Sequence, residues 1–95
     1  MNRVVIDGAV GRGPEPIEGG AFFTIWPDGS EHTIRCEARD ILGAALRGGA
    51  RLAPGDRIRV EGSLVQRVEY VEAYGCTIAY FHIEARCITR KLKKG

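Results

Sequence analysis

Arginine and aromatic side chains are the residues of this sequence whose types and spacing suit them best to chemistry. In the segment Asp56–Val65, Arg57 and Arg59 alternate with Ile58 and Val60, so an extended chain presents both guanidinium groups on one face. Guanidinium groups pair with phosphates, and flat rings stack on nucleic-acid bases at about 1–3 kcal/mol per base. Together these residues indicate binding of a single-stranded nucleic acid.

The candidate binding residues combine cations from several segments with aromatic rings. The cations would follow the phosphates, and each phosphate neutralised would make binding weaker as the salt concentration rises. The rings would stack on the bases. The predicted set is Arg3, Arg12, Trp26, Arg35, Arg57, Arg59, Arg67, Tyr70, Tyr74, Tyr80, Arg86 and Lys91.

Each of these residues also has a purely structural interpretation. The arginines would form a solvated face that keeps a small protein soluble. The Trp26 ring would fold over the mouth of a barrel, and Tyr70 and Tyr74 would pack on each other in a hairpin or in a contact between subunits. These alternatives stay open at the level of sequence.

Patterns of catalytic or metal-binding residues are absent from the sequence. It contains no nucleophile elbow, P-loop or HExxH motif, and Cys36, Cys76 and Cys87 lack CxxC or Cys/His spacing. His32 and His82 are isolated; we expect His32 in or near the core and His82 pointing outward, within reach of a phosphate. We therefore expect no enzyme activity, no cofactor and no metal, with the three thiols reduced and buried.

Length and composition are those of one small globular domain. The 95 residues are 44% hydrophobic and 27% charged, and the formal net charge of +2 permits a nucleic-acid partner without requiring one. The first ten residues do not have the pattern of a signal peptide, and no stretch approaches the roughly 20 apolar residues of a membrane span. We expect a soluble, cytoplasmic protein that does not associate with membranes.

Alternation of apolar and polar residues predicts five strands and one short helix. The strands are expected over residues 2–10, 21–26, 31–38, 56–65 and 77–88, and a helix over 41–46 with Asp40 as its cap. Glycines and prolines predict a loop over 11–20 and turns at Pro27–Ser30 and Pro54–Gly55. Residues 66–75 are predicted to be a polar connection or the arm of a hairpin.

The same alternation separates inward from outward side chains. The residues expected to point inward are Phe23, Ile25, His32, Ile34, Cys36, Ala38, Ile58, Val60, Leu64, Phe81, Ile83, Ala85 and Cys87. Those expected outward include Phe22, Trp26, Arg35, Glu37, Tyr80, His82, Glu84 and Arg86, with a place under the helix as the alternative for Phe22. The order of three strands, a helix and two strands predicts an all-β, five-stranded OB-fold barrel with one short helix between strands 3 and 4. We expect this domain over residues 1–89 and a basic tail over 90–95.

Two segments carry a resemblance to a known family. The opening MNRVVIDGAVGRGPEP and the segment PGDRIRVEGSL at 54–64 are similar to the first and fourth strands of bacterial single-stranded-DNA-binding proteins. The segment GGAFFTI, which ends at Ile25, resembles the second strand of that family, and IEARCI at 83–88 matches the last strand in character. The sequence resembles equally the primosomal replication protein B branch of this superfamily. The resemblance implies an OB-fold that associates through its first strand and holds single strands in an open groove.

Three departures separate the sequence from the replicative members of that family. The hairpin between the second and third strands is reduced to a Pro-Asp-Gly turn. Glu31 and Glu37 fall near positions where the family often has stacking rings; they are expected to pair with Arg35 and would repel phosphate. The acidic C-terminal tip is replaced by Lys91, Lys93 and Lys94, so recruitment through that tip does not carry over.

The leading hypothesis is a sequence-nonspecific single-stranded DNA-binding protein that assists replication, recombination or repair. Its expected partners are single-stranded DNA, with RNA as the alternative, and replication proteins. A homodimer or homotetramer is expected to form through the strand Asn2–Val10, because an edge so rich in valine and isoleucine needs cover. The second hypothesis is a primosomal-type accessory or protein-interaction OB module with weak or no DNA binding. The third hypothesis, a minor one, is a cold-shock-like RNA-binding domain.

Overall fold

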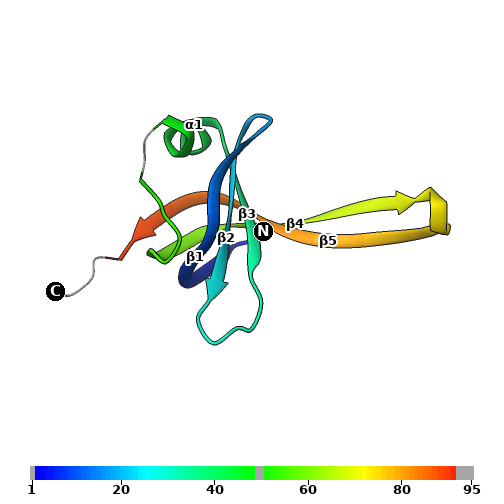
Figure 1. Ribbon diagram of the computed structural model, residues 1–95, viewed down its shortest axis with the longest axis horizontal. Helices are drawn as coiled ribbons and strands as arrows, with labels where there is room; N and C mark the ends of the chain where they lie inside the picture. The colour runs from blue at the N-terminus through cyan, green and yellow to red at the C-terminus, as the bar shows by residue number, and fades with distance from the viewer. Residues whose placement is uncertain (1, 49–50, 92–95) are drawn as a thin grey trace.

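Five strands close into one barrel with a short helix at one end (Figure 1). The computed structural model describes residues 2–48 and 51–91. The elements are β1 (Val4–Ile17), β2 (Gly20–Pro27), β3 (Ile34–Arg39), α1 (Asp40–Gly48), β4 (Arg57–Val71), the 3-10 turn η1 (Glu72–Tyr74) and β5 (Cys76–Arg90). The strands are neighbours in the order β1-β2-β3-β5-β4, with β3 and β5 parallel. The predicted fold class is confirmed, including the position of the helix.

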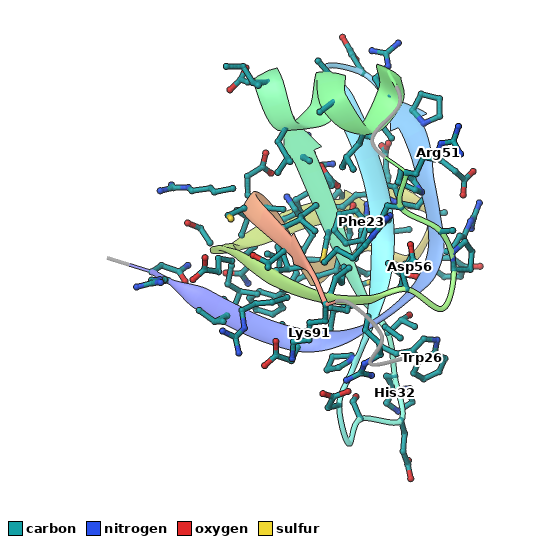
Figure 2. The ribbon with its side chains drawn as sticks, turned by 90° about the vertical axis from the view of Figure 1, so that its left-hand side faces the viewer. Phe23, Trp26, His32, Arg51, Asp56 and Lys91 are labelled. Carbon is teal, nitrogen blue, oxygen red and sulfur yellow. The ribbon has the colours of Figure 1, made fainter. Side chains whose placement is uncertain are left out.

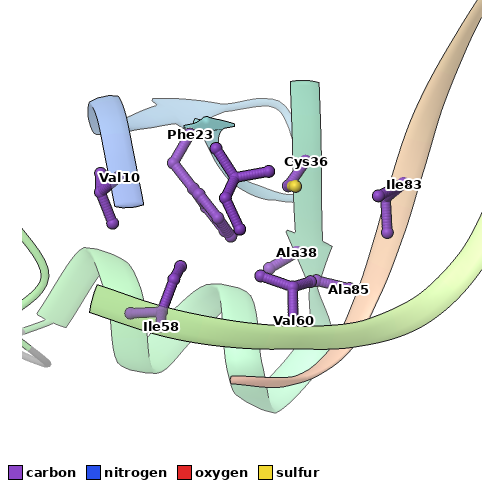
Figure 3. Close-up of a cluster of buried hydrophobic side chains, with 9 residues drawn as sticks. Val10, Phe23, Cys36, Ala38, Ile58, Val60, Ile83 and Ala85 are labelled. Carbon is purple, nitrogen blue, oxygen red and sulfur yellow. The ribbon is translucent and has the colours of Figure 1, made fainter. Parts of the chain in front are cut away.

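The core is formed by side chains that alternate along all five strands (Figure 3). Phe23 and Ile25 of β2 meet Ile58 and Val60 of β4 in the interior, and all four are fully buried. The remaining core residues are Val10, Cys36, Ala38, Ile83 and Ala85. Apart from Val10 these were predicted to point inward, so a period of two located most of the core. Leu42 and Leu46 of α1 pack against the same cluster.

β1 is longer than predicted, since residues 11–17 continue the strand instead of forming a loop. From Gly8 to Ile17 the strand pairs with β2, and two register shifts absorb its irregular residues. Pairing with β4 ends at Ala9, and Val10 hydrogen-bonds to Gly55 and Asp56; beyond it, no strand of the described residues lies beside the other edge of residues 11–17. Pro14 and Pro16 are tolerated on such an edge because no strand there requires their missing N–H groups.

β3 begins at Ile34, three residues later than predicted. The Pro27–Ser30 turn is confirmed by the hydrogen bond from the Ser30 amide to the Pro27 carbonyl, at 3.0 Å. His32 lies in the connection after this turn and is exposed, so its predicted place in or near the core is wrong. Its backbone amide donates to the Ser30 hydroxyl instead. Figure 2 shows His32 at the end of the barrel, on the side of Trp26 and away from α1.

The hairpin of β4 and β5 extends well beyond the barrel (Figure 1). Its pairing runs without a break from Leu64↔Ile83 to Val71↔Cys76, and the molecule is 53 Å long in this direction. We call residues 65–81 the arm. Residues 66–75 were predicted to be a polar connection or the arm of a hairpin, and the second interpretation is correct. Leu64 and Phe81 have inward-facing parity but are largely exposed, because no other strand covers the hairpin here. Their predicted burial is therefore wrong.

A bulge in β5 changes the parity of its last residues. Glu61 pairs with Cys87 and Gly62 with Ala85, so Arg86 is the extra residue. The shift turns Cys87 to the outside, and Cys76 lies exposed at the end of the arm, so two of the three predicted buried thiols are wrong. Gly62 is required at the bulge, since a Cβ there would lie 2.1 Å from the Glu84 carbonyl oxygen.

Beyond the bulge, β5 runs to Arg90, and the Lys91 amide donates to the Arg57 carbonyl at 2.8 Å. The rest of the predicted basic tail, residues 92–95, lies outside the described residues. Among the described residues, α1 is a nine-residue helix, and no helix is suited to crossing a membrane.

Candidate nucleic-acid interface

One outer surface of the barrel collects rings and guanidinium groups from all five strands. In the pairing register, Phe22 of β2 is opposite Glu37 of β3, which is opposite Glu84 of β5. Side chains opposite one another share a face of the sheet, so these residues all point outward. We call this surface the β2–β3–β5 face; its residues are Arg12, Glu15, Phe22, Trp26, Arg35, Glu37, Arg39, Arg67, Tyr80, His82 and Glu84.

Phe22 is the centre of a layered contact on this face. The Arg35 guanidinium lies over the Phe22 ring with its Cζ 4.0 Å from the ring centroid, and Arg12 lies at 5.5 Å. Glu15 and Glu37 are opposite Phe22 on either side, and each holds one of these arginines through hydrogen bonds. A guanidinium over an aromatic face is attracted by the electrons of the ring.

Trp26 lies further along β2 on the same face. Its indole packs over Gly11 of β1, where a Cβ would come within 3.1 Å of both Cδ1 and Nε1. Nearly half of the Trp26 residue surface is nevertheless exposed. The ring is therefore supported by the β1 backbone, and its exposed part is available for stacking on a base.

Glu37 is the buried centre of an ion-pair network. Its carboxylate accepts hydrogen bonds from Arg35 at 2.8 Å and from Arg39 at 2.7 Å, and Arg67 lies at 3.8 Å. Burial alone would raise the pKa of Glu37, but the hydrogen bonds from Arg35 and Arg39 outweigh it, so this pKa lies below its ordinary value. The predicted pairing of Glu37 with Arg35 is confirmed, although Glu37 is buried and not solvated.

His82 and Glu84 complete the network on β5. His82 has the predicted outward parity but is buried, and its Nε2 lies 3.2 Å from a Glu84 carboxylate oxygen. Its Nδ1 is the one buried side-chain nitrogen or oxygen without a hydrogen-bond partner among the described residues. The carboxylates of Glu37 and Glu84 and the His82 ring lie close enough to share a metal ion. Arg39 already donates to both carboxylates, so the group is better described as an ion-pair network.

The arginines of this face differ in how many donors remain for a ligand. A guanidinium has five N–H donors. Arg39 uses both of its terminal nitrogens on Glu84 and Glu37, and hydrogen bonds to these carboxylates raise its pKa. Arg35 donates through Nε alone, as far as the described residues show, so its terminal nitrogens keep their donors. Arg67 has only the 3.8 Å ion pair with Glu37 in the part of the chain that the structure describes.

A depression lies where the arm leaves the barrel. It has a volume of about 240 Å³ and is lined by Arg35, Glu37, Arg67, Tyr80, Phe81 and His82. The Tyr80 hydroxyl donates to Glu69 at 3.0 Å, and this hydrogen bond raises the pKa of Tyr80. The hydrogen bond anchors one end of the ring, while the ring itself stays partly exposed.

The predicted site residues therefore fall into separate groups. Arg12, Trp26, Arg35, Arg67 and Tyr80 come together on the β2–β3–β5 face. Another group lies where β1 meets β4, and there each cation is paired with a carboxylate: Arg3 with Glu61, Arg57 with Asp28, and Arg59 and Lys91 with Asp7. Hydrogen bonds from Arg59 and Lys91 hold the pKa of Asp7 well below its ordinary value.

The remaining predicted residues lie apart from both groups. Tyr70 and Tyr80 lie on different faces of the arm. Tyr80 pairs with Arg67 and so shares its face, whereas Tyr70 is three residues from Arg67 on β4 and therefore points to the other face. Tyr74 lies in η1 at the end of the arm and is highly exposed. Arg86 is the bulged residue of β5 and has no ion pair within the described part of the chain.

Six residues of the face were not among the predicted site residues, and two of these six, Phe22 and Arg39, are an aromatic ring and a cation. Phe22 was expected outward but was not included among the binding residues, although its outward parity beside Trp26 was a usable signal. Arg39 follows the last residue of the predicted third strand, so no face was assigned to it. The observed strand includes Arg39 and turns it toward Glu37 and Glu84.

Comparison with solved structures identifies the architecture. The mitochondrial single-stranded DNA-binding protein Rim1 of S. cerevisiae superposes with a TM-score of 0.76 at 17% identity, covering 99% of this chain and 97% of Rim1. The barrel has the OB fold of single-stranded DNA-binding proteins. The small single-stranded DNA-binding protein of Streptomyces coelicolor, at 24% identity, covers 100% of both chains with a TM-score of 0.63. The Plasmodium falciparum SSB, solved in complex with ssDNA, has 18% identity and a TM-score of 0.68 over 96% of this chain and 95% of its own.

These matches confirm the expected resemblance at the level of fold. None of the three similar proteins is named as an enzyme. No protein-family model matches the sequence, and no curated protein matches it. Since the identities are all below 25%, any role of individual residues has to be argued from this chain's own geometry.

Proposed function

We propose that this protein binds single-stranded DNA without sequence preference, on the β2–β3–β5 face and the adjoining arm. The observation that carries the proposal is the depression lined by Arg35, Arg67 and Tyr80, with Trp26 further along the same face of a barrel of this fold. Guanidinium groups pair with any phosphate, and rings stack on any base, so such a surface is indifferent to sequence. The role is that of an accessory in replication, recombination or repair, and it includes no catalytic step.

The other predicted cations lie on a separate surface, where β1 meets β4, and the proposal includes them as a second set of phosphate contacts. Arg3, Arg57, Arg59 and Lys91 form exposed ion pairs, and such pairs contribute only about 0–1 kcal/mol each. A phosphate therefore replaces the carboxylate partner at small cost. Tyr70 and Tyr74 of the arm add two exposed rings, and Arg86 at the bulge adds an exposed cation; the proposal includes all three, although they lie apart from the β2–β3–β5 face.

We also propose self-association through the start of β1. Within the described residues, Val4–Ile6 pair with β4 on one side only, because pairing with β2 begins at Gly8 and the Asp7 carbonyl accepts from the Asp28 amide. This leaves an open strand edge with Val5 exposed on it, and such an edge pairs readily with another strand. A Val5→Pro variant removes one edge N–H and is expected to reduce the mass measured by light scattering; an unchanged mass would exclude the edge as the interface.

A fluorescence titration tests DNA binding. Trp26 is the only tryptophan, so oligo-dT is expected to quench its emission, with a binding constant that falls steeply as salt rises. Arg67→Ala is expected to weaken binding more than the matched variant Arg47→Ala, since Arg47 of α1 lies outside the proposed surface. If oligo-dT does not quench Trp26 emission even at low salt, or if the binding constant does not change with salt concentration, the proposal is rejected.

The second candidate function is a protein-interaction module with weak or no DNA binding. It is favoured by the carboxylates Glu15, Glu37, Glu69 and Glu84, which accept hydrogen bonds from the face's own arginines and tyrosine. The same titration separates the two candidates, because this module would leave Trp26 emission unchanged by oligo-dT. Competition with oligo-rU in place of oligo-dT measures the preference between RNA and DNA.

A further inference from the structure

At the centre of the β2–β3–β5 face, a guanidinium group covers an aromatic ring. The Phe22 ring is covered by Arg35, whose Cζ lies 4.0 Å from its centroid. The Arg35 guanidinium therefore occupies a side of the Phe22 ring on which a base would otherwise stack. Guanidinium planes stack on bases in the same way as aromatic side chains do.

Two contacts position the Arg35 guanidinium group. The Phe22 ring packs against it, and Glu37 accepts a hydrogen bond from its Nε at 2.8 Å. Glu37 is itself immobilised, since its side chain is almost fully buried and also accepts from Arg39. The Arg35 side chain remains 43% exposed, so its outer surface is open to a ligand.

We propose that Arg35 is the central stacking residue for a DNA base, with Phe22 and Glu37 as the residues that position its guanidinium plane. This inference rests on the proposed function and assigns Arg35 a contact with the base, where the alternative is a contact with phosphate only. Arg67 is the natural comparison on the same face, because among the described residues its guanidinium group lies over no aromatic ring, and the proposal makes it a phosphate ligand.

The test compares two lysine variants on two strands. Lysine keeps the positive charge but has no plane to stack. Binding of oligo-dT and of an abasic strand of equal length and charge is measured by competition against a labelled oligo-dT. Arg35→Lys is expected to reduce the affinity for oligo-dT about tenfold, within the range for one stacked base, and to leave the abasic strand nearly unchanged. Arg67→Lys is expected to change both affinities by less than about twofold, because a phosphate contact needs only the charge.

Two further variants test the positioning residues. Phe22→Leu keeps the bulk and removes the ring, and Glu37→Gln keeps one acceptor and removes the charge. Both are expected to lower the ratio of oligo-dT affinity to abasic affinity, and this ratio is insensitive to the change in net charge that Glu37→Gln brings. Circular dichroism and urea unfolding of each variant show that the barrel is intact.

The outcomes distinguish this inference from the function on which it rests. If the wild type binds neither strand, single-stranded DNA binding itself is rejected. If the wild type binds oligo-dT but Arg35→Lys lowers neither the affinity nor the ratio, Arg35 is a phosphate ligand and the stacking role is overturned. Equal losses of affinity on both strands would overturn the stacking role as well, because the abasic strand has no base to stack.

Discussion

The barrel and the arm are built from the same two strands, yet they differ in what lies behind each face. In the barrel, β4 pairs with β1 as far as Gly62, and β5 pairs with β3 at Ile83 and Glu84. In the arm the same alternation continues, but its apolar residues are exposed because no third strand or helix covers them. Stability is therefore expected to be concentrated in the barrel, whereas the arm exposes rings and apolar surface.

The largest difference in unfolding free energy between the two regions is expected for alanine variants of two phenylalanines. Phe23 is 0% exposed in the barrel and Phe81 is 54% exposed in the arm. Phe23→Ala is expected to lower the free energy of unfolding by about 3–5 kcal/mol, through lost burial and a cavity. Phe81→Ala is expected to cost less than about 1 kcal/mol. Urea unfolding measures both, and similar losses for the two variants would show that the arm contributes to the core.

Thiol reactivity separates the same regions. Burial raises the pKa of Cys36 in the barrel to about 12, so its reactive thiolate is scarce and shielded at neutral pH. Cys76 in the arm and Cys87 beside the bulge are exposed. Iodoacetamide is expected to modify two of the three cysteines of the folded protein, as counted by mass spectrometry. Rapid labelling of Cys36 before unfolding would show that the barrel opens.

The arm offers a matched pair for DNA binding. Val68 and Tyr70 lie on the same face of the arm and are 65% and 63% exposed. Tyr70→Ala is expected to weaken oligo-dT binding about fivefold by removing a stacking ring, while Val68→Ala leaves it nearly unchanged. Neither variant should alter the urea midpoint. Equal effects of the two variants would mean that this face contributes only apolar surface.

The smallest effect concerns Asp7, where β1 meets β4. Its pKa lies below the ordinary value of 3.8 because Arg59 and Lys91 hydrogen-bond to its ionised form. A carboxylate with a lower pKa in the folded state contributes stability above its unfolded pKa, and this contribution disappears as the pH falls through the folded pKa. The urea midpoint of Asp7→Asn is therefore expected to fall less than that of the wild type between about pH 5 and pH 2. Parallel curves would show that the Asp7 ion pairs do not stabilise the barrel.

Much of the candidate site was accessible from the sequence. Alternation placed Arg35, Tyr80 and Trp26 on outward positions, and the structure brings them to one surface. The carboxylate partners of Arg57 and Arg59 were not accessible, since Asp28 and Asp7 are distant in sequence and become neighbours only through strand pairing. The contact of Arg35 with Phe22 likewise depends on the register of β2 against β3.

The sequence by itself determined the order of the elements and the inward faces of the strands, because a two-residue period is a local property of the extended chain. It did not determine where each face is covered, and for this reason Leu64 and Phe81 were expected in a core that ends before them. Only the tertiary structure decided the bulge at Arg86, which turned Cys87 outward, and the burial of Glu37 and His82. Both depend on which strands become neighbours when the barrel closes, and alternation along a single strand carries no information about that.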